Sequence, residues 1–200
     1  MMKGIDVSEN NGCIDWEAVA AAGVQFAIIR LGWGKRHLDS RFYENINGAI
    51  NAGLKVGVYY YSYATTQEEA EDEADFVVET LDDCGLTPDK LELGVWIDEE
   101  DADRWRCRNG LDYYNNSQLV TNMATAAVNK FWDAGYTPSG IYVNCDWKKN
   151  VIDFSQTGGA GLWLAQPDYD SPDYACNIWQ YTFTLDIGGK TFDGDIFYDE

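Results

Sequence analysis

Two acidic side chains, Asp98 and Glu100, directly follow an apolar run in the stretch GVWIDEED. Successive side chains of a strand point to opposite faces, so Asp98 and Glu100 share one face while Glu99 points to the other. Two neighbouring carboxylates perturb each other, so that one titrates low while the other can hold its proton near neutral pH. Glycoside hydrolysis needs a carboxylic acid that protonates the leaving oxygen. The pair therefore predicts chemistry on sugars.

Two other interpretations of the acidic run stay open. Crowded like charges are hard to desolvate, so a solvated loop after a strand is one alternative. Clustered carboxylates also bind Ca²⁺ or Mg²⁺, but the DxDxDG spacing of a calcium loop is absent, and we expect no metal and no cofactor. His37 is the single histidine, and none of the five cysteines forms a CxxC pair. Both facts argue against a zinc site and against Ser–His or Cys–His catalysis.

Further acids fall near the ends of other expected strands. Asp6 lies near the end of the first strand, GIDV. Asp193 and Asp195 lie at the start of the last strand, in FDGDIFY, and we prefer Asp195 because it begins the apolar run. Aromatic rings with a polar edge suit sugar rings, and the chain has eight Trp and thirteen Tyr. The sugar contacts that we expect are Tyr59, Tyr61 and Trp163.

The elements that position these residues alternate between two periodicities. Near-continuous apolar runs predict strands that are buried on both faces, as in a parallel sheet. The first five such runs are residues 4–7, 26–31, 55–61, 93–97 and 140–143. Apolar stripes at helical spacing predict helices between several of these runs. The clearest stripes lie within residues 42–53, 70–81 and 119–134.

After residue 144 the helical pattern stops, while strand-like pieces continue at 162–165, 177–181 and 195–198. Eight strands that alternate first with helices predict an α/β fold closed into a barrel. Active sites of such barrels lie at the carboxyl ends of the strands, where Asp6 and Asp98 are expected. An open doubly wound sheet is the alternative, but it needs a Gly-rich phosphate loop where this chain has VSENNGCIDW.

The composition limits the partners. A formal net charge of −20 argues against nucleic acid and against adhesion to an anionic membrane by charge alone. No apolar stretch approaches the roughly 20 residues of a membrane span, and MMKGIDVSEN has no apolar signal core. No linker or low-complexity stretch interrupts the chain, so we expect one domain over residues 1–200, and we expect a monomer.

Taken in order, these segments resemble those of the glycoside hydrolase family 25 lysozymes over essentially the whole chain. The segments concerned are GIDVSENNGCIDW, FAIIRLGWG, AGLKVGVYYYS, VWIDEE, GIYVN, LWLA, IWQYT and DGDIF. One departure is Glu99, because the family often has an aliphatic residue between the Asp and the Glu. Its strand parity points Glu99 outward, so we expect no catalytic loss.

The resemblance implies a single (βα)5β3 barrel, a variant of the TIM barrel. It implies hydrolysis of the β-1,4 bond between N-acetylmuramic acid and N-acetylglucosamine in peptidoglycan, at an extracellular or cell-wall location. Glu100 would be the general acid and Asp98 its partner, which orients the acetamido group of the substrate; Asp6 and Asp195 complete an acidic cluster. The origin of the nucleophile, enzyme or substrate, stays open. So do a chitinase-like or other N-acetylhexosaminidase, and a catalytically silent glycan-binding barrel.

Overall fold

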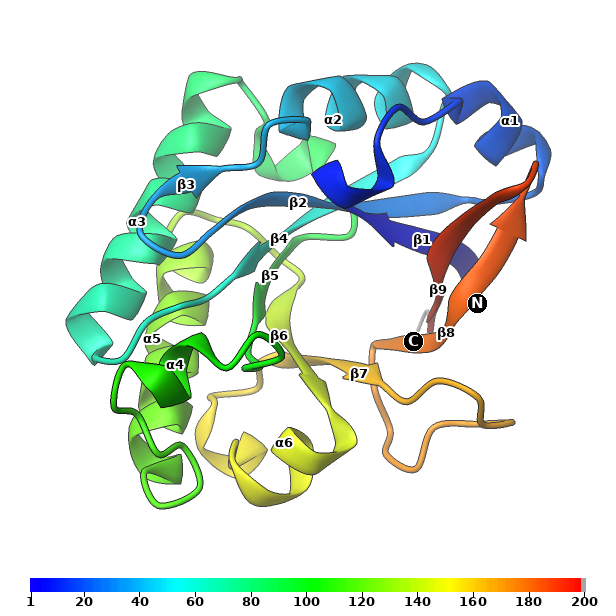
Figure 1. Cartoon of the computed structure of the whole chain (residues 1–200). Coiled ribbons are helices and arrows are strands. Elements are labelled where there is room, and N and C mark those ends of the chain that lie inside the picture. Colours follow the sequence, from blue (N-terminus) through cyan, green and yellow to red (C-terminus); the bar gives the residue numbers. More distant parts are fainter. Residues whose placement is uncertain (199–200) are drawn as a thin grey trace.

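A closed barrel of eight strands forms the centre of the molecule (Figure 1). The computed structural model describes residues 1–198. The barrel strands are β1 (Met2–Val7), β2 (Phe26–Trp33), β4 (Lys55–Tyr61), β5 (Val95–Asp98), β6 (Ser139–Asn144), β7 (Gly161–Ala165), β8 (Ile178–Ile187) and β9 (Lys190–Phe197). The barrel closes because β1 pairs with both β2 and β9. A two-residue strand, β3 (His37–Leu38), pairs with β2 outside the ring.

Strand direction decides where the two ends of the barrel lie. The seven strands from β1 to β8 around the ring run parallel to one another. Only β9 among the described barrel strands is antiparallel, to β8 on one side and to β1 on the other. The start of β9 therefore lies at the end of the barrel where the parallel strands finish, and Asp193, in the first half of β9, lies beside Asp6 of β1.

Helices follow each of the first five barrel strands. They are α1 (Trp16–Ala21), α2 (Phe42–Asn51), α3 (Gln67–Asp83), α5 (Ser117–Asp133) and α6 (Cys145–Asn150), with the single turn α4 (Trp105–Arg108) inserted before α5. Three 3-10 turns lie at Glu9–Asn11, Pro88–Lys90 and Phe154–Gln156. This order confirms the predicted (βα)5β3 barrel. The sequence missed α6, because six residues are too few to display an apolar period.

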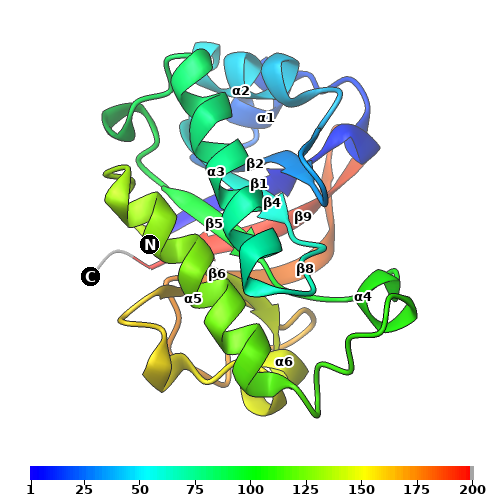
Figure 2. The ribbon, with the colours of Figure 1, turned by 90° about the vertical axis from the view of Figure 1, so that its left-hand side faces the viewer.

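The two long helices α3 and α5 pack side by side against one flank of the barrel (Figure 2). Thr66 begins α3, since its side chain accepts a hydrogen bond from the backbone N–H of Glu69. The helix ends before Gly85, whose φ of 64° is the left-handed conformation that glycine adopts without strain. The interval between these two residues is close to the helix that the apolar stripe predicts.

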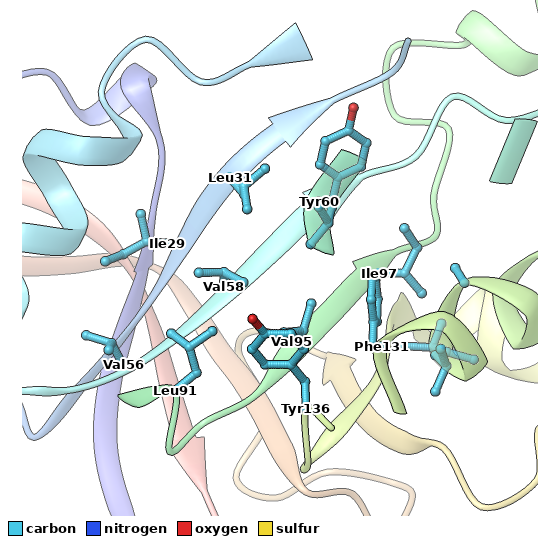
Figure 3. Close-up of a cluster of buried hydrophobic side chains, with 14 of the residues drawn as sticks. Ile29, Leu31, Val56, Val58, Tyr60, Leu91, Val95, Ile97, Phe131 and Tyr136 are labelled. Atoms are coloured by element: carbon cyan, nitrogen blue, oxygen red, sulfur yellow. The ribbon is translucent and has the colours of Figure 1, made fainter. Parts of the chain in front are cut away.

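Strand side chains separate into two apolar groups according to parity. Outward-facing residues of β2, β4 and β5 pack under the helices, together with Phe131 of α5 (Figure 3). Inward-facing residues fill the barrel, and one of the largest is Trp96. Its indole fits because Gly140 and Gly161 face it; a Cβ at these glycines would lie 2.5 Å and 2.9 Å from indole carbons. None of the described helices combines the length and the apolar character needed to cross a bilayer.

Candidate active site

A cavity of about 400 Å³ opens at the carboxyl ends of the strands. Four acids line it: Asp6, Asp98, Glu100 and Asp193. The interpretation of residues 98–101 as a solvated loop is wrong, since Asp98 is 5% exposed and Glu99 is fully buried. Two of the clustered acids, Asp98 and Glu100, are the ones that strand parity selects.

Asp98 is the last residue of β5 and is held by both neighbouring strands. Its carbonyl accepts the backbone N–H of Ser62, and the next N–H, of Glu99, donates to Tyr142. The side chain continues the inward row of Trp96, and its Oδ1 has no hydrogen-bond partner among the described residues. Burial, followed by the charge of Glu100, raises the pKa of Asp98 well above its usual range. The Oδ1 of Asp98 is therefore available to form a hydrogen bond with a ligand in the cavity.

Glu100 lies two residues beyond Asp98 and reaches the same cavity, as the parity predicts. Burial raises its pKa to about 7, with further contributions from the carboxylates of Asp103 and Asp6. The guanidinium of Arg106 acts in the opposite direction. A carboxyl group with a pKa near 7 holds a proton at neutral pH and can donate it, which is the property of a general acid.

Asp6 is joined to the opposite wall of the cavity by a chain of hydrogen bonds. Nε2 of Gln180 donates to Oδ2 of Asp6 at 2.7 Å, and the Tyr142 hydroxyl donates to Oε1 of Gln180 at 2.9 Å. Burial raises the pKa of Asp6 to about 6, while the hydrogen bond from Gln180 opposes that change. This chain fixes the orientation of three buried polar groups around the site.

The structure separates Asp193 from Asp195. Asp193 pairs with Asp6 across the β1–β9 ladder and lines the cavity, and burial raises its pKa to about 7. Asp195 lies one inward position deeper, is fully buried, and accepts a hydrogen bond of 2.9 Å from Nε1 of Trp163. Burial and Asp6 raise the pKa of Asp195 well above its usual range. The Oδ2 of Asp195 has no hydrogen-bond partner among the described residues.

The three expected sugar contacts all reach the cavity, but in different ways. Tyr59 and Tyr61 follow the same inward row of β4 and are partly exposed. Trp163 is 1% exposed, and its ring lies edge-to-face against Tyr59 with 5.8 Å between centroids. Trp163 thus forms the base of the cavity. Tyr60, on the outward face, donates its hydroxyl to the carbonyl of Gly34 instead.

Sequence reasoning missed seven residues of the cavity wall, and three of them are polar side chains of barrel strands. Gln180, Tyr142 and Arg30 line the site, each within an apolar strand that had been identified only as core. A polar side chain at an inward position of such a strand was the available signal, since a buried polar group needs a partner. Arg30 has one in Asp39, with 2.8 Å between Nε and Oδ2.

His37 and the five cysteines do not line the cavity. His37 is exposed in β3, where its ring lies 4.0 Å from that of Trp33. All five cysteines are free thiols. Within residues 1–198 no three His, Cys, Asp or Glu side chains are arranged to hold a metal ion. The cavity-lining carboxyl groups with raised pKa values can transfer protons to and from a bound substrate.

A closed βα barrel with clustered carboxyl groups at the carboxyl ends of its strands has the arrangement of barrel glycoside hydrolases. Comparison with known sequences identifies the family. A profile described as Glycosyl hydrolases family 25 matches residues 5–190. The chain belongs to this family, as the resemblance predicted.

Two curated relatives match nearly all of the chain. Lysozyme M1 of Streptomyces globisporus is 41% identical over 206 residues, which cover 97% of this chain and 66% of that protein. Autolytic lysozyme of Clostridium acetobutylicum is 33% identical over 202 residues, which cover 98% of this chain and 55% of that protein. The chain thus spans between about half and two thirds of the length of these relatives.

Solved structures agree with the fold. A family 25 glycosyl hydrolase from Bacillus anthracis superimposes with a TM-score of 0.81 at 19% identity, covering 100% of this chain and 90% of that one. The bacterial lysozyme from Streptomyces coelicolor gives 0.80 at 23% identity, covering 99% and 92%. At these identities the likeness shows the barrel architecture.

Proposed function

We propose that this chain is a peptidoglycan hydrolase that cleaves the β-1,4 bond between N-acetylmuramic acid and N-acetylglucosamine. The observation that carries the proposal is Glu100, a cavity-lining carboxyl group whose pKa burial raises to about 7 beside the buried Asp98. Two family relatives bear the name lysozyme, and the autolysin LytC of Streptococcus pneumoniae, a fold neighbour, has been solved with a synthetic peptidoglycan ligand.

Glu100 serves as the general acid in this proposal. At neutral pH a substantial fraction of it carries a proton, which passes to the glycosidic oxygen as the bond to the anomeric carbon breaks. Asp98 orients the acetamido group, because its unpartnered Oδ1 can accept the amide N–H of the substrate. Asp6 and Asp195 complete the cluster: Asp6, whose pKa burial raises to about 6, is mostly ionised at pH 7 and places negative charge near the reacting centre, where an oxocarbenium-like transition state develops positive charge.

The glycan strand itself is the partner that we propose. Tyr59 and Tyr61 present partly exposed rings to the cavity, and Trp163 forms its base, so a sugar ring can rest against aromatic faces while its hydroxyls reach the carboxylates. We propose further that residues 1–200 act as one catalytic domain and as a monomer, at the cell wall or outside the cell, where peptidoglycan is found.

Digestion of purified Gram-positive peptidoglycan tests the proposal. Wild-type protein and Glu100→Gln are compared, and the new reducing ends are identified. We expect new reducing muramic acid with the wild type, and a decrease of at least about 100-fold with the variant, which cannot protonate a leaving group. Reducing glucosamine ends would indicate a glucosaminidase instead. Release from chitin oligomers in preference to peptidoglycan would favour the chitinase-like alternative.

A catalytically silent barrel gives a different result. Such a protein would bind glycan strands but release no reducing ends with either sequence. Near-normal activity of Glu100→Gln would contradict the assignment of the acid. Asp75→Asn serves as the matched control, because it also converts a carboxylate to an amide, but on the outer surface of α3, where Asp75 pairs with Lys130.

A further inference from the structure

The residue between the two acids of the cavity, Glu99, is itself a buried charge. It continues the outward row of Val95 and Ile97 on β5, and it is fully buried. Its Oε2 forms an ion pair with Nη1 of Arg106, which is also fully buried and belongs to the single turn α4. The sequence correctly pointed Glu99 away from the cavity, but it gave no sign of this partner seven residues later.

The ion pair is poorly explained by stability alone. Both charges are removed from water, and Oε1 of Glu99 and Nε and Nη2 of Arg106 have no hydrogen-bond partner within residues 1–198. Replacing such a pair by apolar side chains of similar volume is often neutral or stabilising. The ion pair does, however, hold the backbone next to Glu100 in place.

The pair holds the chain on one side of Glu100, and Asp101 holds it on the other. Oδ1 of Asp101 accepts the backbone N–H of Arg106 at 2.8 Å, and Oδ2 accepts that of Cys107 at 3.0 Å. Glu100 is therefore the one residue between two that are both fastened to α4. Strand β5 ends at Asp98, so beyond Glu99 the sheet ladder no longer fixes the backbone.

Resting on the proposed function, we propose that Arg106 is a positioning residue, which acts through Glu99 to hold the carboxyl group of Glu100 at the reacting bond. An outward side chain thus determines the placement of an inward one, because successive residues of a strand share a backbone. A misplacement of a catalytic group by about 1 Å can lower a rate by as much as about 100-fold.

The charge of Arg106 gives the pair a second effect. Arg106 lowers the pKa of Asp98 and Glu100 against the dominant effect of burial. It also acts on Glu73 of α3, whose pKa burial raises to about 8. The other titratable or charged groups around Glu100 are Asp6 from β1, Arg30 from β2, Tyr61 from β4, Asp98 from β5, Asp101 and Asp103 from the following loop, Tyr142 from β6 and Asp193 from β9. Removing Arg106 raises the pKa of Glu100, so the acid stays protonated to higher pH.

The test compares three variants with the wild type on peptidoglycan, recording kcat, KM and the pH profile. Glu99→Met with Arg106→Met removes the pair while keeping the net charge and the side-chain volume. Arg106→Lys keeps the charge but loses the planar fork. Asp75→Asn with Lys130→Met is the control, since it neutralises a partly exposed ion pair between α3 and α5, outside the cavity.

For the double Met variant we expect a folded protein whose kcat falls about 10-fold, with KM within about 2-fold of the wild type. Its loss of activity at high pH should move upward by about half a pH unit. Arg106→Lys should lower kcat and leave the pH profile in place. The control pair should change neither. A purely structural role would lower thermal stability without moving the pH profile.

Wild-type kcat and pH profile in a folded double Met variant would overturn the inference. If that variant does not fold, Arg106→Lys decides: a reduced kcat with KM and thermal stability near those of the wild type supports the inference, and a wild-type kcat, or a kcat that falls only together with thermal stability, overturns it. The proposed function fails separately, when the wild type releases no reducing ends or when Glu100→Gln keeps its activity. Absence of wild-type cleavage overturns both.

Discussion

The two ends of the barrel interior are built from the same strands but have opposite chemistry. At the amino end the inward side chains are apolar and close-packed: Phe26, Ile28, Leu93, Trp96 and Ile178. At the carboxyl end they are polar or charged: Asp6, Arg30, Asp98, Gln180 and Asp193. The change occurs within one inward step, from Ile28 to Arg30 on β2 and from Ile178 to Gln180 on β8.

This difference shows that one end of the barrel stabilises the fold and the other end carries the reactive groups. The apolar end excludes water and holds the strands together, and its burial also supplies the low-dielectric base on which the acids rest. The polar end accepts a loss of stability, since four carboxyl groups with raised pKa values surround one cavity. Mutations at the two ends should therefore separate stability from activity.

The largest effect is expected at the apolar end. Trp96→Ala removes a fully buried indole that faces two glycines, so the neighbouring chain cannot fill the space. We expect the free energy of unfolding to fall by about 3–5 kcal/mol, measured by urea denaturation. Trp105→Ala, at a partly exposed ring stacked on Tyr63, is the control and should be milder. Equal losses of unfolding free energy in the two variants would mean that the buried Trp96 contributes no more to stability than the partly exposed Trp105.

The second effect belongs to the polar end. Glu100→Gln should lower kcat/KM by at least about 100-fold, or about 2.7 kcal/mol of transition-state stabilisation, without lowering stability. At pH 8 the variant should even be more stable than the wild type, because an amide needs less solvation than a buried carboxylate. Activity assays and thermal unfolding at pH 8 measure both. If Glu100→Gln loses both activity and stability, the carboxyl end of the barrel contributes to stability as the amino end does, and the two ends do not differ in this respect.

The third prediction concerns pH and follows from raised pKa values. Burial raises the pKa of Asp6 to about 6 and those of Glu100 and Asp193 to about 7. The folded protein thus binds more protons than the unfolded chain between about pH 4 and 7, so stability is greatest below this window and falls as pH rises through it. Each such group contributes about 1.4 kcal/mol per pH unit within its window, so we expect a decrease of several kcal/mol between pH 5 and 8.

Thermal unfolding across this range checks the sign. The slope should be smaller in Asp193→Asn, which removes one of the titrating groups. The control Asp112→Asn makes the same substitution on the surface. It should leave the slope of stability against pH nearly unaltered or slightly steeper, since hydrogen bonds lower the pKa of Asp112. Stability that rises from pH 5 to 8 would contradict the raised pKa values of the cluster.

The smallest effect is expected at the rim of the cavity. The hydroxyl of Tyr61 accepts the backbone N–H of Ala102 at 3.2 Å, next to the loop that carries Glu100. Tyr61→Phe removes this acceptor and keeps the ring. We expect substrate binding to weaken by about 1 kcal/mol, which is measured as a KM about five-fold higher with little change in kcat. Tyr43→Phe, an exposed residue of α2, is the control. A large fall in kcat would instead give Tyr61 a part in the chemistry.

Much of the barrel could be predicted because it rests on local periodicity. The apolar runs at 26–31 and 55–61 became β2 and β4, and the stripe at 70–81 became α3. The alternation along β5 puts Trp96 and Ile97 on opposite faces, and the structure shows Trp96 inside the barrel and Ile97 outside. Site residues Asp98 and Glu100 followed from the same parity.

What could not be predicted depends on pairs that are distant in the chain. The choice between Asp193 and Asp195 depends on the register between β1 and β9, which puts Asp193 beside Asp6 and Asp195 one layer deeper. The sequence preferred Asp195 as a member of the site. In the structure both acids adjoin Asp6, but only Asp193 lines the cavity.

The sequence by itself determined which faces of each strand are apolar and where each apolar run stops, because side-chain alternation is a property of neighbouring residues. It therefore determined the barrel and the two acids that end β5. Tertiary structure alone decided how strongly those acids hold their protons, since burial and the approach of Asp6, Asp103 and Arg106 set the pKa of Glu100. A pKa depends on everything within a few ångströms, and that neighbourhood exists only once the ring of strands has closed.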